Sequence, residues 1–196
     1  MIAIVDYQAG NLTSVKKAFL RFTHECVVTS DPAQVRRADM LVLPGVGHFS
    51  ATGVLTKNEL NEAILDHLRR GAPLLGICLG LQWLFDGSEE AREFSGLGIF
   101  KGVCASFPAS VKSPHVGWNR IRLLGPTRLI RGIPDNSYFY FTHSFRAPVV
   151  DATTAVCQYG ASFAAAVERD NVFGVQFHPE KSGATGLRVV ENFCAL

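Results

Sequence analysis

The chain has 196 residues, a mass of 21.3 kDa and a formal net charge of +2 at pH 7. That length suits one compact domain with a sizeable core. A charge so close to zero gives no reason to expect nucleic acid or a membrane surface as a partner. No apolar run approaches the about 18 residues that cross a bilayer, and the N-terminus does not resemble a signal peptide. We therefore expect a cytoplasmic protein.

Cysteine is present in an odd number, and no two cysteines have the Cys-x-x-Cys spacing of a metal or redox motif. Neither a disulfide framework nor a zinc site is expected. The sequence also lacks a P-loop and a Gly-x-Gly-x-x-Gly fingerprint, so the chain is not expected to bind and rearrange a nucleotide by itself. We expect no metal and no cofactor. The cysteines are Cys26, Cys78, Cys104, Cys157 and Cys194.

The first half of the chain alternates short apolar runs with segments of helical period. Asn11 or Thr13 can cap the first helix, and Asp31-Pro32 is an N-cap followed by proline at the first helical position. Repeated strand–helix units predict a parallel sheet with helices on both faces. The expected strands are Ile2–Asp6, Cys26–Thr29, Met40–Leu43 and Pro73–Ile77, and the expected helices are Leu12–Phe22, Asp31–Arg37, Leu60–Leu68 and Leu79–Phe85.

From about Gly102 onward, strand-like runs follow one another across short turns, of which Asp170-Asn171 is typical of a hairpin. Antiparallel strands are therefore expected before a last helix near Gly186–Cys194. We predict a single three-layer, flavodoxin-like α/β domain over residues 1–196, with a mixed, mainly parallel sheet and antiparallel strands in the second half. The expected strands are Val103–Phe107, Asn119–Leu123, Ser137–Phe141, Thr154–Gln158, Ser162–Glu168 and Val172–Phe177.

Cys78 differs from the other cysteines in its surroundings. It lies where an apolar strand meets a helical segment, with Gly76 and Gly80 two residues to either side. A strained strand-to-helix turn that exposes a nucleophile has no room for side chains at those flanks. The helix start also stabilises a thiolate. Cys78 is therefore the candidate nucleophile, whereas the other four cysteines are interpreted as structural.

A partner for this thiol occurs in Phe177-His178-Pro179-Glu180. His178 follows a predicted strand, and catalytic groups collect at strand ends in open α/β sheets. Histidine can take a thiol proton and later protonate a leaving amine at neutral pH. Glu180 can orient the imidazole through its second nitrogen.

The segments Gly76–Gln82 and Phe177–Glu180 together resemble the two signatures of triad-type (class I) glutamine amidotransferases. Further segments narrow the resemblance to the glutaminase subunit of imidazole glycerol phosphate synthase. The resemblance extends from Asp6 to Ser182 and implies one class I glutamine amidotransferase domain over residues 1–196. Gln8 and Thr142 depart from the family pattern without touching the triad. The further segments are Asp6–Leu12, Pro44–Phe49, Pro114–Asn119 and Tyr138–Phe145.

This resemblance implies that Cys78 attacks glutamine and forms a thioester, with His178 as base and acid and Glu180 orienting it. It places the oxyanion hole at the backbone N–H groups of Leu79 and Val46, and it implies a reorienting loop peptide that switches the hole on and off. Residues expected to bind the substrate L-glutamine are Gly45, Gly47, Gln82, His143 and Ser144. Residues expected to face a partner subunit are Gly10, Asn11, Trp118, Asn119, Tyr140 and Lys181, with Trp118 in a loop.

The implied partner is the (β/α)8-barrel cyclase subunit of the synthase, in a heterodimer. It receives ammonia through a tunnel and makes imidazole glycerol phosphate and an aminoimidazole carboxamide ribotide in histidine biosynthesis. Three alternatives remain open from the residues. The chain could supply ammonia to a synthase for vitamin B6, anthranilate or GMP, act as a cysteine hydrolase of other specificity, or be a regulatory partner without activity.

Overall fold

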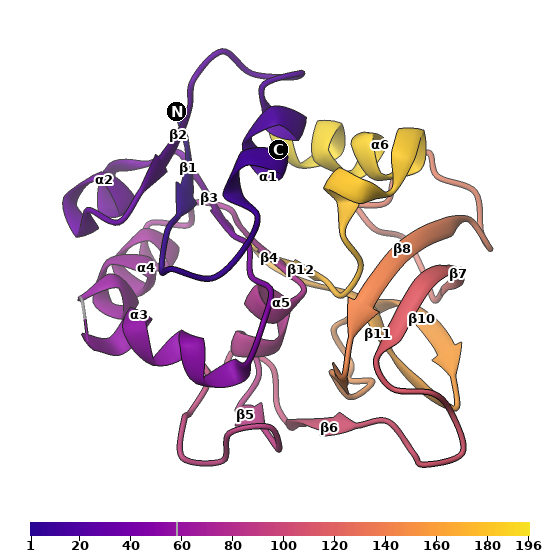
Figure 1. Ribbon diagram of the computed structural model, residues 1–196. Coiled ribbons are helices and arrows are strands. Elements are labelled where there is room, and N and C mark those ends of the chain that lie inside the picture. Colours follow the sequence, from indigo (N-terminus) through magenta and orange to yellow (C-terminus); the bar gives the residue numbers. More distant parts are fainter. Residues whose placement is uncertain (58) are drawn as a thin grey trace.

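The computed structural model describes residues 1–57 and 59–196. Its main sheet has the strand order β2-β1-β3-β4-β12-β11-β10-β7-β8 (Figure 1). Neighbours from β2 to β12 run parallel, and those from β12 to β8 run antiparallel. The 2-1-3-4 order is that of flavodoxin-like sheets, so the predicted mixed sheet is confirmed. The strands are β1 (Ile2–Val5), β2 (Cys26–Thr29), β3 (Met40–Leu43), β4 (Leu74–Ile77), β7 (His115–Leu123), β8 (Tyr138–His143), β10 (Thr153–Tyr159), β11 (Ala161–Arg169) and β12 (Val172–Val175).

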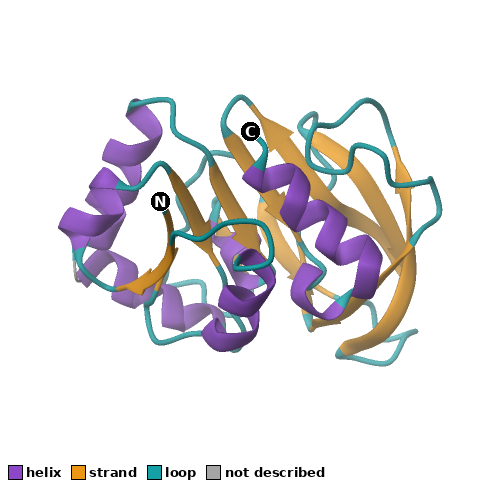
Figure 2. Ribbon diagram, turned by 90° about the horizontal axis from the view of Figure 1, so that it is seen from above, coloured by secondary structure: helices purple, strands orange, loops and turns teal. Residues whose placement is uncertain are grey.

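Helices cover both faces of the sheet, which gives the predicted three layers (Figure 2). Neighbouring residues of β1 show the division, because Ile4 belongs to the core under one face and Val5 to the core under the other. The first core is closed by α1 (Leu12–Phe19) and α6 (Gly183–Cys194), and the second by α2 (Pro32–Arg37), α3 (Gly53–Lys57), α4 (Leu60–Arg69) and α5 (Leu79–Trp83). None of the helices in the described residues combines the length and apolarity that a bilayer crossing requires.

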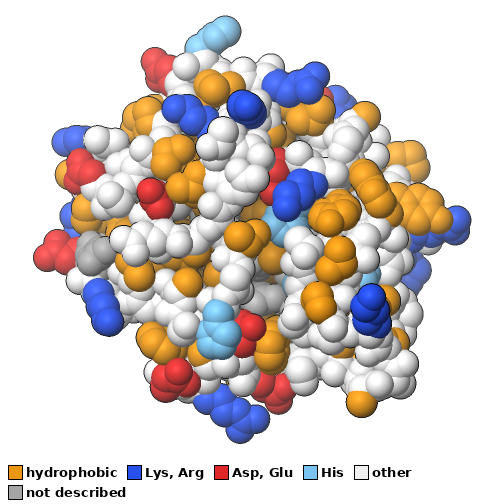
Figure 3. Space-filling model, viewed as in Figure 1, with side chains coloured by type: hydrophobic (Ala, Val, Ile, Leu, Met, Phe, Trp, Pro, Cys, Tyr) orange, Lys and Arg blue, Asp and Glu red, His pale blue; other side chains and the backbone are white. Residues whose placement is uncertain are grey.

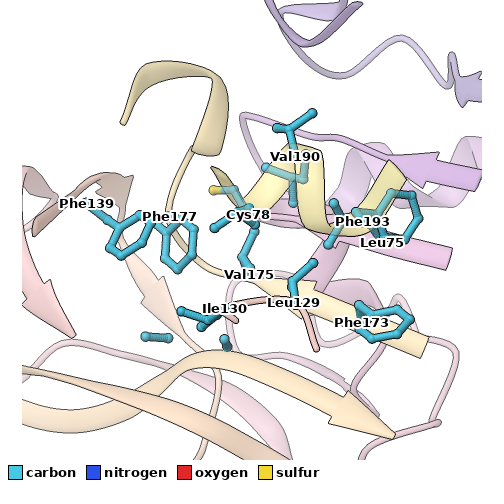
Figure 4. Packing of buried hydrophobic residues seen from close by; sticks show 14 of the residues in the cluster. Leu75, Cys78, Leu129, Ile130, Phe139, Phe173, Val175, Phe177, Val190 and Phe193 are labelled. Atoms are coloured by element: carbon cyan, nitrogen blue, oxygen red, sulfur yellow. The ribbon is translucent and has the colours of Figure 1, made fainter. Parts of the chain in front are cut away.

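The strand β12 is held from both faces. Phe173 and Phe177 belong to the core that α6 covers, and the rings of Phe173 and Phe193 lie 6.0 Å apart (Figure 4). On the opposite face, a Cβ at Gly174 would come within 2.4 Å of Leu81 in α5. Successive strand residues point to opposite faces, so this packing fixes β12 firmly just before the segment that carries His178.

Two regions differ from the prediction. The expected loop at His115–Asn119 is the first half of β7, which pairs with β8 from His115↔His143 onward. A second sheet consists of β5 (Gly87–Ser88), β6 (Val103–Ser106) and β9 (Phe145–Arg146). Of these three strands, only β6 was predicted. Two-residue strands carry no alternation that a sequence pattern can register. The 3-10 helices η1 (Phe49–Thr52) and η2 (Pro179–Lys181), and α3, were likewise not predicted.

Candidate active site

Cys78 occupies the sharp turn between β4 and α5, as predicted. Its backbone has φ +53° and ψ −104°, a conformation that costs a residue with a side chain of order 1–3 kcal/mol. The flanking positions have no room for a side chain, because a Cβ at Gly76 would lie 2.7 Å from the Gly80 carbonyl. A Cβ at Gly80 would lie 1.8 Å from the Leu43 carbonyl oxygen. The Cys78 side chain is buried but borders a cavity.

His178 lies just beyond β12, the strand paired with β4, and its backbone N–H donates to the Tyr140 carbonyl of β8 at 2.9 Å. Its Nδ1 is 2.8 Å from Oε1 of Glu180, and both side chains are almost fully buried. Among the described residues, Nε2 of His178 has no hydrogen-bond partner. Because the carboxylate can only accept, Nδ1 carries the proton and Nε2 is the nitrogen available to take another.

The electrostatics of His178 favour the protonated ring. Burial lowers its pKa, but the negative charges of Cys78 and Glu180 outweigh burial and raise the pKa above its ordinary value. A thiolate beside an imidazolium is the reactive form of a cysteine nucleophile. The arrangement can therefore carry out nucleophilic attack on a carbonyl with proton transfer through His178.

A cavity of about 280 Å³ opens beside Cys78. Glu90, which was not predicted as a site residue, accepts the Phe49 N–H through its carboxylate at 2.7 Å and borders the same space. A carboxylate here complements the ammonium group of an amino acid. Glu90 lies in an irregular segment after β5, where no pattern in the sequence marks it. The cavity is lined by Gly47, Cys78, Leu79, Gln82, Glu90, Pro114, Thr142, His143, Ser144 and Phe145.

The two expected oxyanion donors do not point into the cavity together. The Leu79 N–H donates to the Gly45 carbonyl at 3.3 Å. Since the C=O and N–H of a trans peptide point in opposite directions, the N–H of Val46 in the same peptide faces away from Leu79. In this orientation, the carbonyl of the Gly45–Val46 peptide holds the Leu79 N–H in a hydrogen bond. The N–H of the same peptide, which belongs to Val46, points away from the position that an oxyanion would occupy. Val46 is 37% exposed, so the loop lies at the surface.

Buried amides link the thiol to the cavity wall. Gln82 donates to the Phe145 carbonyl at 2.7 Å and to Oε1 of Gln176 at 3.2 Å. Gln176, which was not predicted as a site residue, donates in turn to Cys78 Sγ at 3.6 Å. The signal that marks it is a glutamine between apolar residues of a strand buried on both faces.

A pair of buried histidines continues this network. His143 Nδ1 lies 2.8 Å from the Phe145 carbonyl, and its Nε2 lies 3.2 Å from His115 Nδ1, whose other nitrogen faces the amide of Asn119 at 3.3 Å. Burial lowers the pKa of His115 to about 4 and that of His143 to about 3, so both rings are neutral at pH 7. The carbonyl only accepts, which fixes the proton on Nδ1 in each ring. Both nitrogens of His143 are therefore engaged within the protein.

The residues expected at a partner interface separate into groups. Trp118 is 55% exposed, its ring lies 6.1 Å from that of Tyr140, and Lys181 Nζ lies 5.9 Å from the Tyr140 ring. Hydrophobic and basic side chains gather over this side of the molecule (Figure 3). Asn119 lies on the opposite face of β7 and bonds to His115 instead. Gly10 packs against Gly45, and Asn11 caps α1.

The described residues contain no group of three or more His, Cys, Asp or Glu side chains placed to hold a metal ion. All five cysteines are unpaired. The site thus consists of a strained thiol, a buried histidine–carboxylate pair and a cavity with an acidic wall.

The model of the family described as glutamine amidotransferase class-I matches residues 3–195. The chain therefore belongs to this family, as its two motifs predicted. Among solved structures, PurLQS from Thermotoga maritima has a TM-score of 0.76 at 19% identity and covers 98% of this chain and 96% of that one. At that identity the likeness supports the fold alone.

Relatives of higher sequence identity show where the chain belongs within the class-I glutamine amidotransferase family. The imidazole glycerol phosphate synthase subunit HisH of Moorella thermoacetica is 48% identical over 198 residues, which cover 98% of this chain and 93% of the relative. The subunit of the same name from Thermococcus kodakarensis is 50% identical over 98% of each chain. Within the class-I family, the chain belongs with these HisH subunits.

Proposed function

We propose that this chain hydrolyses L-glutamine to glutamate and ammonia and passes the ammonia to the cyclase subunit of imidazole glycerol phosphate synthase. The observation that carries the proposal is the Cys78 thiol, held in a strained turn at the edge of a cavity beside the His178–Glu180 pair. Membership in the glutamine amidotransferase family and the names of the HisH relatives support the same reaction.

The proposed reaction has two halves. Cys78 Sγ bonds to the side-chain carbonyl carbon of glutamine, and the proton on His178 Nε2 passes to the leaving nitrogen, so that the C–N bond breaks and ammonia leaves. Water then attacks the thioester with His178 as base, the C–S bond breaks, and glutamate is released. Glu180 holds the ring so that Nε2 faces the sulfur throughout.

Substrate binding is proposed to use the lining of the cavity. Glu90 faces the α-ammonium group, while Gln82, Ser144 and the backbone of Gly47 contact the rest of the amino acid. Gly45, also expected to bind the substrate, does not line this cavity, so a contact from it would require the loop to move. His143 acts through the Phe145 carbonyl that it holds, because neither of its ring nitrogens is available to a ligand.

The oxyanion hole is proposed to form on activation. Rotation of the Gly45–Val46 peptide would release the Leu79 N–H and turn the Val46 N–H toward the developing oxyanion. Loss of one such donor typically lowers the rate by about 10²–10³. The resting chain is therefore expected to hydrolyse glutamine slowly until the partner and its nucleotide shift this peptide.

The docking surface is proposed to be the Trp118–Tyr140–Lys181 side together with Gly10 and Asn11. The partner is proposed to be a (β/α)8-barrel cyclase, and the place of work is proposed to be the cytoplasm, where a catalytic thiol stays reduced. Unpaired cysteines in the described residues support that compartment.

The decisive experiment measures glutamate release by the chain alone, with the cyclase subunit, and with the cyclase and its nucleotide ligand. A large increase in the last case is expected, and Cys78→Ala should abolish it. Labelling of Cys78 by the glutamine analogue diazo-oxo-norleucine distinguishes a glutaminase from a hydrolase of other specificity. Unchanged turnover in Cys78→Ala would refute the catalytic assignment, and strong activity without the partner would refute the coupling.

A further inference from the structure

Gln176 is a fully buried polar residue that touches both the thiol and the cavity wall. It stands between Val175, the last residue of β12, and Phe177, and its backbone N–H donates to the Ala165 carbonyl at 2.9 Å. Its side chain lies on the α5 face of the strand, whereas Phe177 packs under the other face. An apolar residue would fill such a position at lower cost, since burying an amide is unfavourable unless it is hydrogen-bonded.

Both ends of this amide are used, and each end bonds to a different functional group. Nε2 donates to Cys78 Sγ at 3.6 Å, and Oε1 accepts from Gln82 Nε2 at 3.2 Å. The second N–H of the Gln82 side chain donates to the Phe145 carbonyl at 2.7 Å. Gln176 therefore connects Cys78, the nucleophile on the turn, to Gln82, the residue proposed to contact glutamine.

We propose that Gln176 is a positioning residue that aims and stabilises the Cys78 thiolate through its N–H and orients Gln82 through its carbonyl oxygen. This proposal rests on the proposed function for the role of Gln82, whereas the contact with the sulfur is independent of the substrate. A sulfur that becomes negatively charged accepts a hydrogen bond more strongly than a neutral thiol. The N–H of Gln176 thus favours the reactive form.

The two ends can be separated by substitution. Gln176→Glu keeps an acceptor for Gln82 but replaces the donor to sulfur with an oxygen. Gln176→Met has similar length and removes both bonds. Asn192→Leu is the matched control, because Asn192 is also a buried amide with two hydrogen bonds but lies on α6, bonded to Leu129 and Arg131.

The first measurement is alkylation of Cys78 by iodoacetamide across pH, which needs no glutamine. Both Gln176 variants should react on the order of tenfold more slowly at pH 7, with the midpoint of the profile moved to higher pH, because a charge-assisted hydrogen bond is lost. Asn192→Leu should keep the parent's profile even if it melts at lower temperature. A folded Gln176→Glu with the parent's alkylation profile would overturn the proposal.

The second measurement is glutamine turnover in the assembled synthase. Gln176→Glu should lower kcat on the order of tenfold with KM within about twofold of the parent, whereas Gln176→Met should also raise KM several-fold as Gln82 loses its partner. Equal KM values in the two variants would overturn the Gln82 half. If alkylation behaves as expected but no chain hydrolyses glutamine, the proposed function fails while the sulfur contact stands.

A third measurement leaves Gln176 itself unaltered and so remains possible if neither Gln176 variant folds. The side-chain amide resonance of Gln176 in an NMR spectrum should move with pH at the midpoint of the alkylation profile and should stop moving in Cys78→Ser. A resonance that does not respond to either change would overturn the proposal.

Discussion

The ion pair between His178 and Glu180 provides the sharpest test of the mechanism. Glu180→Gln keeps the size of the side chain and leaves an oxygen that can accept the Nδ1–H. It removes the negative charge that stabilises the protonated ring. It also allows the amide to turn its NH₂ group toward the imidazole, which would place the ring proton on the wrong nitrogen.

The geometry sets the size of the effect. Nδ1 and Oε1 are 2.8 Å apart with side chains 2% and 3% exposed, so two full charges there attract by about 6 kcal/mol at an effective dielectric constant of about 20. Much of this attraction offsets the cost of burying both groups. Replacing a charge-assisted bond, which contributes about 1.5–3 kcal/mol, by a neutral one of about 0.5–1.5 kcal/mol then costs about 1–1.5 kcal/mol. A wrong tautomer adds the larger part of the loss. We expect kcat to fall by about 10²–10⁴.

The same substitution should change the pH dependence of stability. The pKa of His178 is raised in the folded chain by Cys78 and Glu180 against the effect of burial. The stability that this shift contributes is fully present below the unfolded pKa of histidine and is lost as the pH rises through the folded value. Without the charge of Glu180 the folded pKa falls, so Glu180→Gln should lose stability relative to the parent mainly at neutral pH and below.

The assay compares kcat in the assembled synthase and urea unfolding from pH 5 to 9 in the parent and the variant. Glu191→Gln is the control, because Glu191 forms a half-exposed ion pair with Arg188 at 2.7 Å. Such surface pairs contribute about 0–1 kcal/mol, and this one is not near Cys78. A Glu180→Gln variant with the parent's kcat and the parent's pH profile would refute the reasoning.

Three further outcomes are expected. Glu90→Gln should raise the KM for glutamine about tenfold with a small change in kcat, because it removes the carboxylate proposed to face the α-ammonium group, and steady-state kinetics measure it. Gly80→Ala should unfold at least about 2 kcal/mol more easily in urea and lose glutaminase activity, since its Cβ would lie 1.8 Å from the Leu43 carbonyl oxygen. Trp118→Ala should weaken cyclase binding by about 2 kcal/mol in titration calorimetry while leaving the melting temperature unchanged, because its ring is mostly exposed.

The parts of the site that could be predicted are those where backbone geometry dictates the residue type. The glycines around Cys78 are such a case, since contacts of 2.7 Å and 1.8 Å exclude any side chain at Gly76 and Gly80. The strand–helix alternation of the first half likewise follows from buried strands and amphipathic helices.

The parts that could not be predicted depend on contacts across the fold. The run His115–Asn119 was expected to form a loop, yet pairing with β8 makes it a strand and places Asn119 on the opposite face from Trp118. The role of Glu90 depends on which cavity its loop borders. The direction of the Gly45–Val46 peptide could not be predicted either, because the orientation of a single peptide leaves no pattern in the sequence.

The orientation of that peptide limits how the chain can be kept inactive. The bond from the Leu79 N–H to the Gly45 carbonyl is long, at 3.3 Å, and a neutral hydrogen bond contributes about 0.5–1.5 kcal/mol. By itself it favours the closed arrangement only about 2- to 13-fold, so an isolated chain would keep roughly 7–30% of its full rate.

Keeping the isolated chain less active than this requires further contacts that hold the Pro44–Gly47 loop in its closed arrangement, and the structure contains such contacts. A Cβ at Gly45 would come within 2.1 Å of the Tyr7 hydroxyl and 2.8 Å of the Leu79 side chain, so the peptide turns in a confined space. Gly10 also lies against this loop, where a Cβ would meet Gly45 at 3.5 Å and the Val46 nitrogen at 3.8 Å. Because Gly10 belongs to the proposed docking surface, a partner that shifts the segment after β1 would act on the Gly45–Val46 peptide without touching the thiol.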